Sequence, residues 1–422
     1  MTTRAGDSTE MDGVDFCGTP PQERPALAER QLAALAAREP TVRAFVCLDE
    51  DAARRRLVER PAGPLGRALI GVKDIIETAA FPTRYGEDEI APGPRRDAWC
   101  VAQALRLGGV LLGKTVCTRF AFPVPGPTTN PSDPARTPGG SSSGSAAAVA
   151  AGFVSFAIGT QTAGSTIRPA SYCGVTGFKP SYGLLPTEGV QPIAPTLDHL
   201  GLFARSPRDV WYFVSALAMR RAEILRARQP RRVLVLHLPP TIPQDGYPER
   251  LAALADALCR KGVAVDALAL PFPADDFRQL QQALCYWEAA RLLLAPGGIN
   301  PHPELRELLA PYLDKDIAEY AAARRRRQRY QEQFAALASD YDAVLLPAAT
   351  GTAPARTQTG DAVMSRFWTT LHIPAITVPL WRSPDRLPLG LQLLGRLGED
   401  RALTEVAQWL LSIRLSLNYA AR

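Results

Sequence analysis

Between residues 69 and 205 the chain alternates short apolar runs with segments of helical spacing, and this alternation constrains its fold more than any other feature. The runs at 70–73 and 110–114 are typical of strands, and residues 99–107 between them are typical of a helix. Such a rhythm predicts a layered α/β architecture with a mostly parallel or mixed sheet.

Strand-like runs return in the second half of the chain, after a Pro-rich zone and two helical stretches. Residues 229–247 are Pro-rich and irregular around one short strand at 233–238, and the helical stretches follow at 279–294 and 304–338. The remaining expected elements are helices over 27–38, 146–151 and 401–411 and strands over 45–48, 153–159, 343–346, 375–380 and 389–394. Because strands return after the helices, we expect one sheet with inserted helices and no separate second domain.

These patterns predict a flexible leader over residues 1–25 and a single domain over residues 26–415. Within that domain we expect the core of the fold at about 65–205 and a helical insertion at about 275–340. The chain has 422 residues, of which 46% are hydrophobic and 21% charged. These values are ordinary for a globular protein, and the length is ample for one large core.

The charge pattern gives little support to nucleic-acid or membrane binding. Lys and Arg number 48 against 42 Asp and Glu, so the net charge is only +6, and the arginines are spread along the chain. Nucleic-acid binding usually needs a concentrated basic face, and the arginines at 324–327 and 329 are most typical of a solvated helix face. No stretch has the length of a membrane span, and the first residues lack an apolar signal region. We therefore expect a cytoplasmic protein that binds neither nucleic acid nor membrane.

Cysteine and histidine usage gives no sign of a metal site. The seven cysteines form no CxxC pair and no Cys/His spacing of the metal-binding kind, so free thiols in a reducing compartment are expected. There are four histidines and no HExxH motif. We expect no metal and no cofactor.

Lys73 lies in an apolar run that predicts a buried strand, where a lysine is energetically unfavourable. Burial removes hydration from the charged amine and lowers its pKa, and a neutral lysine can take a proton from a serine hydroxyl. The alternative is a structural lysine that reaches out from a strand edge or pairs with Asp74 or Glu77.

Two Gly- and Ser-rich segments supply hydroxyl groups for such chemistry. Ser141 follows two glycines, which permit backbone conformations closed to other residues, and it opens an Ala-rich stretch. Ser165 closes a turn of small residues over 159–165, whose successive N–H groups could converge on one oxyanion. The alternatives are a flexible turn in which Ser142 or Ser143 caps a helix, and a plain glycine turn. Together, the lysine and the serines suggest a Ser nucleophile driven by a buried Lys rather than by a His.

Other patterns point to weaker alternatives. Arg168, three residues after Ser165, is either a bidentate partner for a substrate carboxylate or the partner of an internal acid. Residues 108–115 match the formula of a phosphate-binding loop, yet their middle is an apolar, strand-like run. Residues 140–144 match a nucleophile elbow but lack the preceding strand, and Cys173 lies in an apolar context typical of a core thiol.

Taken together, these segments resemble the amidase signature family. The likeness is carried by residues 71–74, 113–115, 139–148, 159–165, 168–180, 197–199, 346–348, 373–375 and 387–392. It covers most of the chain, from about residue 32 to residue 411. The resemblance implies the family's fold, a single α/β domain with a mixed central β-sheet covered by helices on both faces.

The resemblance also implies roles for individual residues. Lys73 would be the base, Ser141 a bridging hydroxyl that follows a cis peptide bond, and Ser165 the acyl-forming nucleophile. The oxyanion hole would be formed by backbone N–H groups at Thr162, Ala163, Gly164 and Ser165.

The nucleophile segment departs from the family pattern at three points. Gln161 stands where Asp is common, Ala163 where Gly is common, and Arg168 lies three residues after the nucleophile rather than two. These features resemble a sub-branch that includes enzymes for small, sometimes acidic, amides, so Gln161 and Arg168 are candidate substrate contacts. Further candidates, for which core or surface roles stay open, are Tyr286, Trp287, Glu288 and Arg291.

The sequence thus predicts an amidase that hydrolyses a linear carboxamide or carbamoyl compound to an acid and ammonia or an amine. The reaction would pass through a Ser acyl-enzyme, with the Lys73 base relayed through Ser141. The partner would be a small-molecule amide, and a homodimer is left open. Two alternatives stay in view, namely the glutaminase subunit of a tRNA-dependent amidotransferase complex and a non-catalytic interaction module.

Overall fold

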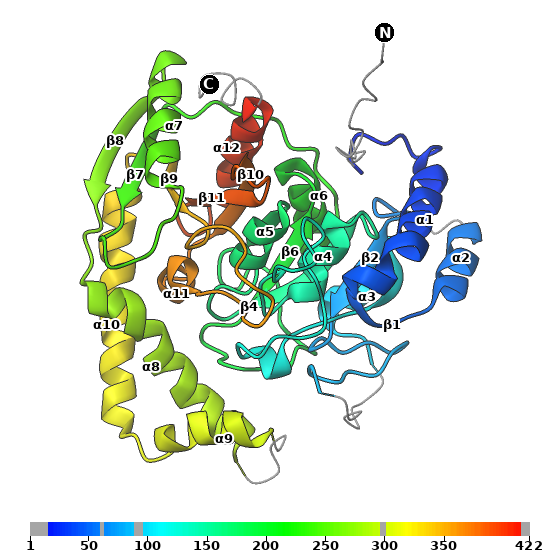
Figure 1. The fold of residues 1–422 in the computed structure, drawn as a ribbon, viewed down its shortest axis with the longest axis horizontal. Coiled ribbons are helices and arrows are strands. Elements are labelled where there is room, and N and C mark those ends of the chain that lie inside the picture. Colours follow the sequence, from blue (N-terminus) through cyan, green and yellow to red (C-terminus); the bar gives the residue numbers. More distant parts are fainter. Residues whose placement is uncertain (1–15, 60–62, 88–95, 296–300, 415–422) are drawn as a thin grey trace.

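The computed structural model describes residues 16–59, 63–87, 96–295 and 301–414 (Figure 1). The strands of this part are β1 (Phe45–Leu48), β2 (Leu69–Lys73), β3 (Val110–Thr115), β4 (Phe156–Gln161), β5 (Thr176–Lys179), β6 (His199–Ala204), β7 (Arg232–His237), β8 (Ala264–Ala269), β9 (Ala343–Pro347), β10 (Ala375–Arg382) and β11 (Pro388–Leu394). The helices are α1 (Arg24–Val42), α2 (Glu50–Val58), α3 (Trp99–Arg106), α4 (Ser143–Ala150), α5 (Ile167–Cys173), α6 (Pro207–Met219), α7 (Pro248–Arg260), α8 (Ala274–Leu293), α9 (Pro303–Leu309), α10 (Ile317–Ala338), α11 (Val363–Thr370) and α12 (Asp400–Ser412), with the 3-10 helices η1 (Arg119–Ala121) and η2 (Ala310–Tyr312). Among these described helices, none combines the length and the apolar character needed to cross a bilayer.

One mixed sheet joins all the described strands, in the order β1-β3-β2-β4-β6-β5-β10-β11-β9-β7-β8. β2 pairs in parallel with β3 and β4, and β7 pairs in parallel with β8 and β9. The remaining neighbours are antiparallel. The single α/β domain with a mixed central sheet is the fold that the sequence predicts.

Helices cover both faces of this sheet, because successive side chains of a strand point to opposite faces. On β4, Phe156 joins an apolar core that includes α3 and α6, whereas Ala157 joins a second core that includes α4. On β2, Ile70 belongs to the first core and Leu69 to the second. Lys73 follows Leu69 by four residues, so its side chain leaves the sheet on the face that α4 covers.

Most expected elements are present, and the differences have physical reasons. The helix expected over 304–338 is interrupted, since α9 ends at Leu309, Pro311 lies in η2, and α10 begins at Ile317. The elements that were not predicted by residue range are the strands β5, β6 and β8 and the helices α2, α5, α6, α7 and α11. β8 is an edge strand with largely exposed residues, so it lacks the alternation of buried apolar positions that marks a strand in a sequence.

The structure describes only part of the predicted leader. Its residues 1–15 lie outside the described residues. Phe16 is buried, and its ring meets the ring of Phe156 edge-on with the centroids 5.2 Å apart. Phe16 is thus packed on the domain and is not part of a flexible leader, whereas residues 21–23 are exposed.

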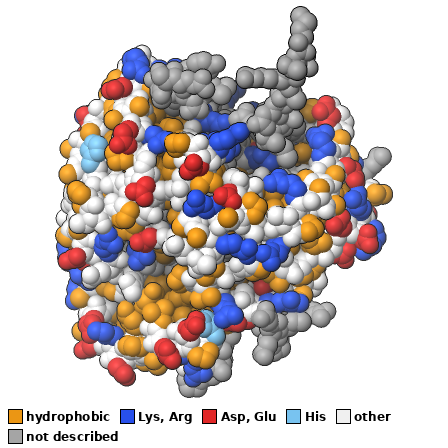
Figure 2. Space-filling view, in the orientation of Figure 1, with side chains coloured by type: hydrophobic (Ala, Val, Ile, Leu, Met, Phe, Trp, Pro, Cys, Tyr) orange, Lys and Arg blue, Asp and Glu red, His pale blue; other side chains and the backbone are white. Residues whose placement is uncertain are grey.

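The inserted helices α8, α9 and α10 lie together along one side of the molecule, and α8 also packs against α11 (Figure 1). The arginine run on α10 is solvated only in part. Arg324, Arg325 and Arg329 are exposed, whereas Arg326 pairs with Asp276 at 2.8 Å. Figure 2 shows basic and acidic side chains interspersed over the described part of one face, without a single concentrated basic field.

Candidate active site

Lys73 ends β2, and its amine lies between two hydroxyl groups inside the protein. The residue is fully buried, and its Nζ lies 2.7 Å from Oγ of Ser141 and 2.8 Å from Oγ1 of Thr160. Thr160 belongs to β4, the parallel neighbour of β2, and Ser141 precedes α4 on the face that this helix covers. The structure therefore brings together the predicted lysine and the predicted bridging serine.

The surroundings of Lys73 shift its titration toward neutral pH. Burial lowers its pKa from 10.5 to about 8, although Cys117 and Asp198 oppose this shift. At pH 7 about one amine in ten is then unprotonated, so a base is available close to neutrality. The alternative of a lysine that reaches solvent does not hold, because none of the residue is exposed.

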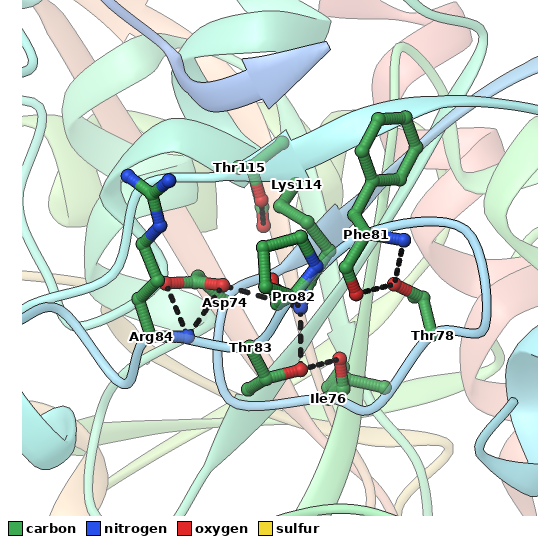
Figure 3. A network of polar contacts seen from close by, with 10 residues as sticks. Asp74, Ile76, Thr78, Phe81, Pro82, Thr83, Arg84, Lys114 and Thr115 are labelled. Carbon is green, nitrogen blue, oxygen red and sulfur yellow. Dashed lines mark hydrogen bonds and ion pairs between the residues drawn. The ribbon is translucent and has the colours of Figure 1, made fainter. Parts of the chain in front are cut away.

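The carboxylate next to Lys73 in sequence, that of Asp74, is engaged by another lysine (Figure 3). Asp74 and Lys114 are both fully buried, and Oδ1 of the first lies 3.1 Å from Nζ of the second. The backbone N–H of Arg84 donates to both oxygens of Asp74, and Lys114 donates to Oγ1 of Thr83 at 2.8 Å. Lys73 is thus left without a carboxylate partner among the described residues.

The segment that carries Ser141 is fixed by the backbone on both sides. The peptide bond between Gly140 and Ser141 is cis, as the resemblance implies. The Ser141 carbonyl accepts from the N–H of Thr118 at 3.1 Å. Ser142 makes no side-chain cap for α4; its Oγ accepts from the N–H of Thr160 and donates to the Thr160 carbonyl. Ser142 therefore ties the segment to β4, and the Ser141 hydroxyl is left for Lys73.

Ser141 and Ser165 line the same cavity, which has a volume of about 240 Å³. Ser165 lies in the turn between β4 and α5 and is 7% exposed. The structure thus places both predicted serines at one small cavity, with the amine of Lys73 behind Ser141. The transfer of a proton between the two serines stays a prediction.

The turn before Ser165 has its carbonyl groups bound by the surrounding protein. The carbonyls concerned are those of Thr162, Ala163 and Gly164. Their donors, in the same order, are Nε2 of Gln281 at 3.0 Å, Oγ1 of Thr369 at 2.6 Å and the N–H of Arg168 at 3.1 Å. The turn is therefore held by α8, by α11 and by the first turn of α5.

These three bonds have a consequence for the N–H groups of the turn. Because the C=O and N–H of a trans peptide unit point in opposite directions, the N–H groups of Ala163, Gly164 and Ser165 point away from those donors. None of the three has an acceptor among the described residues. Free donors beside a nucleophile are what an oxyanion hole requires. Thr162, the fourth predicted member, donates its hydroxyl to Asp198 at 2.5 Å.

Arg168 lies at the cavity as predicted, but it has no acid as a partner among the described residues. Its Nη1 donates to the carbonyl of Gly360 at 2.9 Å and its Nη2 to that of Gly140 at 2.6 Å. Its Nε has no partner in the part of the chain that the structure describes. Burial lowers the pKa of Arg168 to about 10, which leaves the guanidinium charged at neutral pH. A positive charge is therefore available at the cavity.

Gln161 has an internal role where the sequence predicts a substrate contact. It is fully buried, and its Oε1 accepts from the N–H groups of Thr166 and Ile167. Its Nε2 donates to Oγ1 of Thr369 at 2.9 Å. Both ends of the amide are thus used to fix the turn and the start of α5, which argues against a substrate contact by Gln161.

Of the four candidates in the helical region, Tyr286 is the one that lines the cavity. Trp287 stacks on Tyr320 with the ring centroids 4.1 Å apart, and the guanidinium of Arg291 lies 3.7 Å from the centre of the Trp287 ring. Glu288 accepts from the hydroxyl of Tyr320 at 2.9 Å. Trp287 and Glu288 thus connect α8 to α10, whereas Arg291 donates to carbonyls of the 312–315 segment that precedes α10. None of the three lines the cavity.

Among the residues of the site that were missed in the sequence are Thr160, Gln281 and Thr369. Thr160 stands next to Gln161 near the end of β4, so its place in the glycine-rich segment could have suggested a role in the site. Gln281 and Thr369 are 119 and 206 residues away from the backbone groups that they bind. They lie on the helices α8 and α11, and no local pattern marks them.

The remaining motif matches have structural explanations. Residues 110–115 of the phosphate-loop match form β3, so they cannot wrap around a phosphate. Cys173 is buried in α5, and burial raises the pKa of its thiol, which makes it a poor nucleophile. The described residues contain no group of three or more His, Cys, Asp or Glu side chains arranged to hold a metal.

Comparison with family models finds a match to one described as Amidase, over residues 26–235 and 304–404. Among curated proteins, a subunit of the glutamyl-tRNA(Gln) amidotransferase of Chloroflexus aurantiacus is 40% identical over 207 residues, which is 46% of this chain and 42% of the relative. The chain thus matches less than half of that relative's length. The corresponding subunit from an Exiguobacterium species is 29% identical over 425 residues, covering 86% of this chain and 88% of the relative.

Among solved structures, the crystal structure of an amidase is similar along nearly its whole length. The TM-score is 0.81 at 29% identity, and the match covers 93% of this chain and 96% of that chain.

Proposed function

Since the chain belongs to the amidase signature family, we propose that it is an amidase acting on a linear carboxamide or carbamoyl compound. The products are an acid and ammonia or an amine. One observation carries this proposal. The fully buried amine of Lys73 lies against the hydroxyls of Ser141 and Thr160, without a counter-ion among the described residues, beside the cavity that Ser165 lines.

In the first half of the proposed reaction Ser165 attacks the carbonyl carbon of the amide. The neutral amine of Lys73 takes the proton of Ser141, which in turn takes the proton of Ser165. The new C–O bond leaves a negative charge on the carbonyl oxygen, and the free N–H groups of the 162–165 turn stabilise it. As the C–N bond breaks, Ser141 donates its proton to the leaving nitrogen and regains one from Lys73.

In the second half, water cleaves the ester formed on Ser165. Lys73, again neutral, takes a proton from the water by way of Ser141, and the oxygen of the water bonds to the acyl carbon. The same N–H groups stabilise the second oxyanion. When the ester C–O bond breaks, Ser165 recovers its proton through Ser141 and the acid leaves.

We further propose that the substrate is small and carries a carboxylate. The cavity of about 240 Å³ is below the usual range for drug-sized ligands, about 300–1,000 Å³. Arg366 lines the same cavity but lies 3.3 Å from a carboxylate oxygen of Asp361. The unbalanced charge is therefore that of Arg168, and a substrate carboxylate would balance it.

Turnover of a panel of half-amides of small dicarboxylic acids, ureido acids and neutral amides tests both proposals. We expect the carboxylated compounds to be hydrolysed best, and Ser165→Ala and Lys73→Ala to lose turnover. Near wild-type activity in either variant would refute the assigned roles. Labelling with a fluorophosphonate, followed by mass spectrometry, should place the adduct on Ser165 and would rule out a non-catalytic module.

A second candidate is the glutaminase subunit of a tRNA-dependent amidotransferase, which is supported by the names of the relatives. It predicts that the native protein elutes from size exclusion with partner subunits and that the isolated chain hydrolyses glutamine weakly. Elution as one homogeneous species, with full turnover of a small amide, would argue against it.

A further inference from the structure

The hydroxyl of Thr369, at the end of α11, reaches the turn that precedes Ser165. Thr369 is fully buried, and its Oγ1 lies 2.6 Å from the Ala163 carbonyl and 3.0 Å from the carbonyl of Ser365, one helical turn earlier. A hydroxyl has a single proton to donate. The shorter contact receives it, so the bond to Ala163 is the principal one.

Gln161 orients this hydroxyl. Its Oε1 accepts from the N–H groups of Thr166 and Ile167 at 2.8 and 3.0 Å, which fixes the amide with Nε2 toward Thr369. Nε2 donates to the Thr369 oxygen, and the hydroxyl proton is left to point at the backbone carbonyl of Ala163. A carboxylate in place of the Gln161 amide would have no proton to donate at neutral pH.

The close approach of α11 to the turn depends on Gly164. A Cβ atom on Gly164 would lie 3.1 Å from Cβ of Ala362 and 3.3 Å from Cβ of Ser365. The turn and the helix are therefore packed without spare space, so the Thr369 hydroxyl acts on a peptide unit that has little freedom to move elsewhere.

We propose that Thr369 is a positioning residue for the amide hydrolysis, which holds the Ala163 carbonyl so that the Gly164 N–H points at the developing oxyanion. This inference rests on the proposed function, because it needs an oxyanion formed by attack of Ser165. The planar peptide unit transmits the constraint, since turning its carbonyl turns its N–H by the same angle. Thr369 itself touches neither the substrate nor Ser165 in this scheme.

Thr370 offers a matched control on the same helix. It is fully buried as well, and its hydroxyl donates to the carbonyl of Arg366, one turn earlier, at 2.9 Å. Thr369→Val and Thr370→Val each remove one hydroxyl at nearly constant volume. The measurements are kcat and KM for the best amide of the panel and the second-order rate constant for fluorophosphonate labelling of Ser165, all on the full chain.

We expect Thr369→Val to lower kcat and the labelling rate by about 10–100-fold, somewhat less than the loss of an oxyanion donor itself, with KM within about twofold of wild type. Thr370→Val should stay within about twofold in all three quantities, and Thr369→Ser should restore most of the rate. A merely structural hydroxyl would change stability without this split between kcat and KM.

Each other outcome has a definite meaning. If wild type and Thr370→Val label Ser165 and Thr369→Val does so equally fast, the positioning role is overturned while the proposed function stands. If wild type itself is not labelled, the proposed function fails and this inference with it. Should Thr369→Val not fold, Thr369→Cys decides, because the thiol fills the space with a weaker donor; a wild-type rate in that variant would overturn the role.

Discussion

Lys73 and Lys114 are two fully buried lysines on neighbouring parallel strands, yet their partners differ in kind. Lys114 lies opposite Val72 in the ladder, and its Nζ forms an ion pair with the carboxylate of Asp74 (Figure 3). The Nζ of Lys73 contacts the hydroxyls of Ser141 and Thr160 and has no carboxylate beside it within the described part of the chain.

The difference shows that burial alone does not make a base. Burial lowers the pKa of both lysines, but the Asp74 carboxylate, which forms an ion pair with Lys114, opposes that shift there. Hydroxyl groups offer Lys73 no compensating charge, so its pKa falls to about 8. One lysine is thereby suited to proton transfer, and the other holds the 74–84 segment in place.

Of the substitutions that follow, replacement of Lys73 should have the largest effect on turnover. We expect Lys73→Met to lower kcat/KM by about 10⁴-fold, the upper range for loss of a general acid–base group. The free energy of unfolding should be unchanged or higher, because the variant removes a buried amine that has no counter-ion among the described residues. Amide turnover and urea unfolding measure the two quantities. Turnover within tenfold of wild type would show that another group is the base.

Replacement of Lys114 should have the opposite profile. Lys114→Met leaves the Asp74 carboxylate buried and unpaired, which we expect to lower the free energy of unfolding by about 3–5 kcal/mol. Adding Asp74→Asn should recover most of this loss, because the uncompensated charge is then gone. Urea unfolding of the single and double variants measures it, and a double variant no more stable than Lys114→Met would contradict the ion-pair interpretation.

The two lysines also mark what the sequence could and could not predict. Lys73, Ser141 and Ser165 stand in dense local patterns, a lysine in an apolar strand and serines after glycines, so short-range reasoning and the family resemblance located them. Strands such as β3, β4 and β10 were equally predictable, because a strand buried on both faces leaves a continuous apolar run. By contrast, β5 and β6, at the centre of the sheet, were not predicted.

Contacts between residues far apart in the sequence could not be predicted. The partner of Asp74 is on another strand, and Glu77, the other candidate partner for Lys73, instead faces Arg96 at 3.2 Å. Thr369 binds a carbonyl 206 residues away. Such pairs form only when a particular helix packs on a particular turn. The periodicity and composition of one sequence do not predict that packing.

The pH dependence of turnover should follow the neutral form of Lys73. Below its pKa of about 8 the rate should rise about tenfold per pH unit, and it should level off above that value. The free energy of unfolding should also depend on pH, because it is linked to the same titration. The pKa of the folded state lies below the ordinary value of 10.5, so between about 8 and 10.5 the unfolded chain binds more protons. The free energy of unfolding should therefore increase with pH across that window.

Lys73→Met is the control for the stability trend. It should show a smaller rise in stability between pH 8 and 10.5 than wild type, because Lys73 no longer contributes, whereas Lys179, whose burial lowers its pKa to about 7, and Lys114 still titrate. A stability curve for the variant that matches wild type across this window would mean that Lys73 is not the group with the lowered pKa.

The smallest expected effect comes from the second hydroxyl partner, Thr160. In the protonated state Lys73 donates to Oγ1 of Thr160, and this bond favours the charged amine. Thr160→Val should therefore lower the pKa of Lys73 further and move the rise of the pH–rate profile to lower pH, by about one unit or less.

Thr377→Val is a matched control, since Thr377 is also a buried strand threonine but donates to the carbonyl of Ile167. A shift to higher pH in Thr160→Val alone would mean that this hydroxyl donates to the neutral amine. In that case Lys73 would differ from Lys114 because the Thr160 hydroxyl stabilises its neutral amine, and not only because Lys73 lacks a carboxylate partner among the described residues.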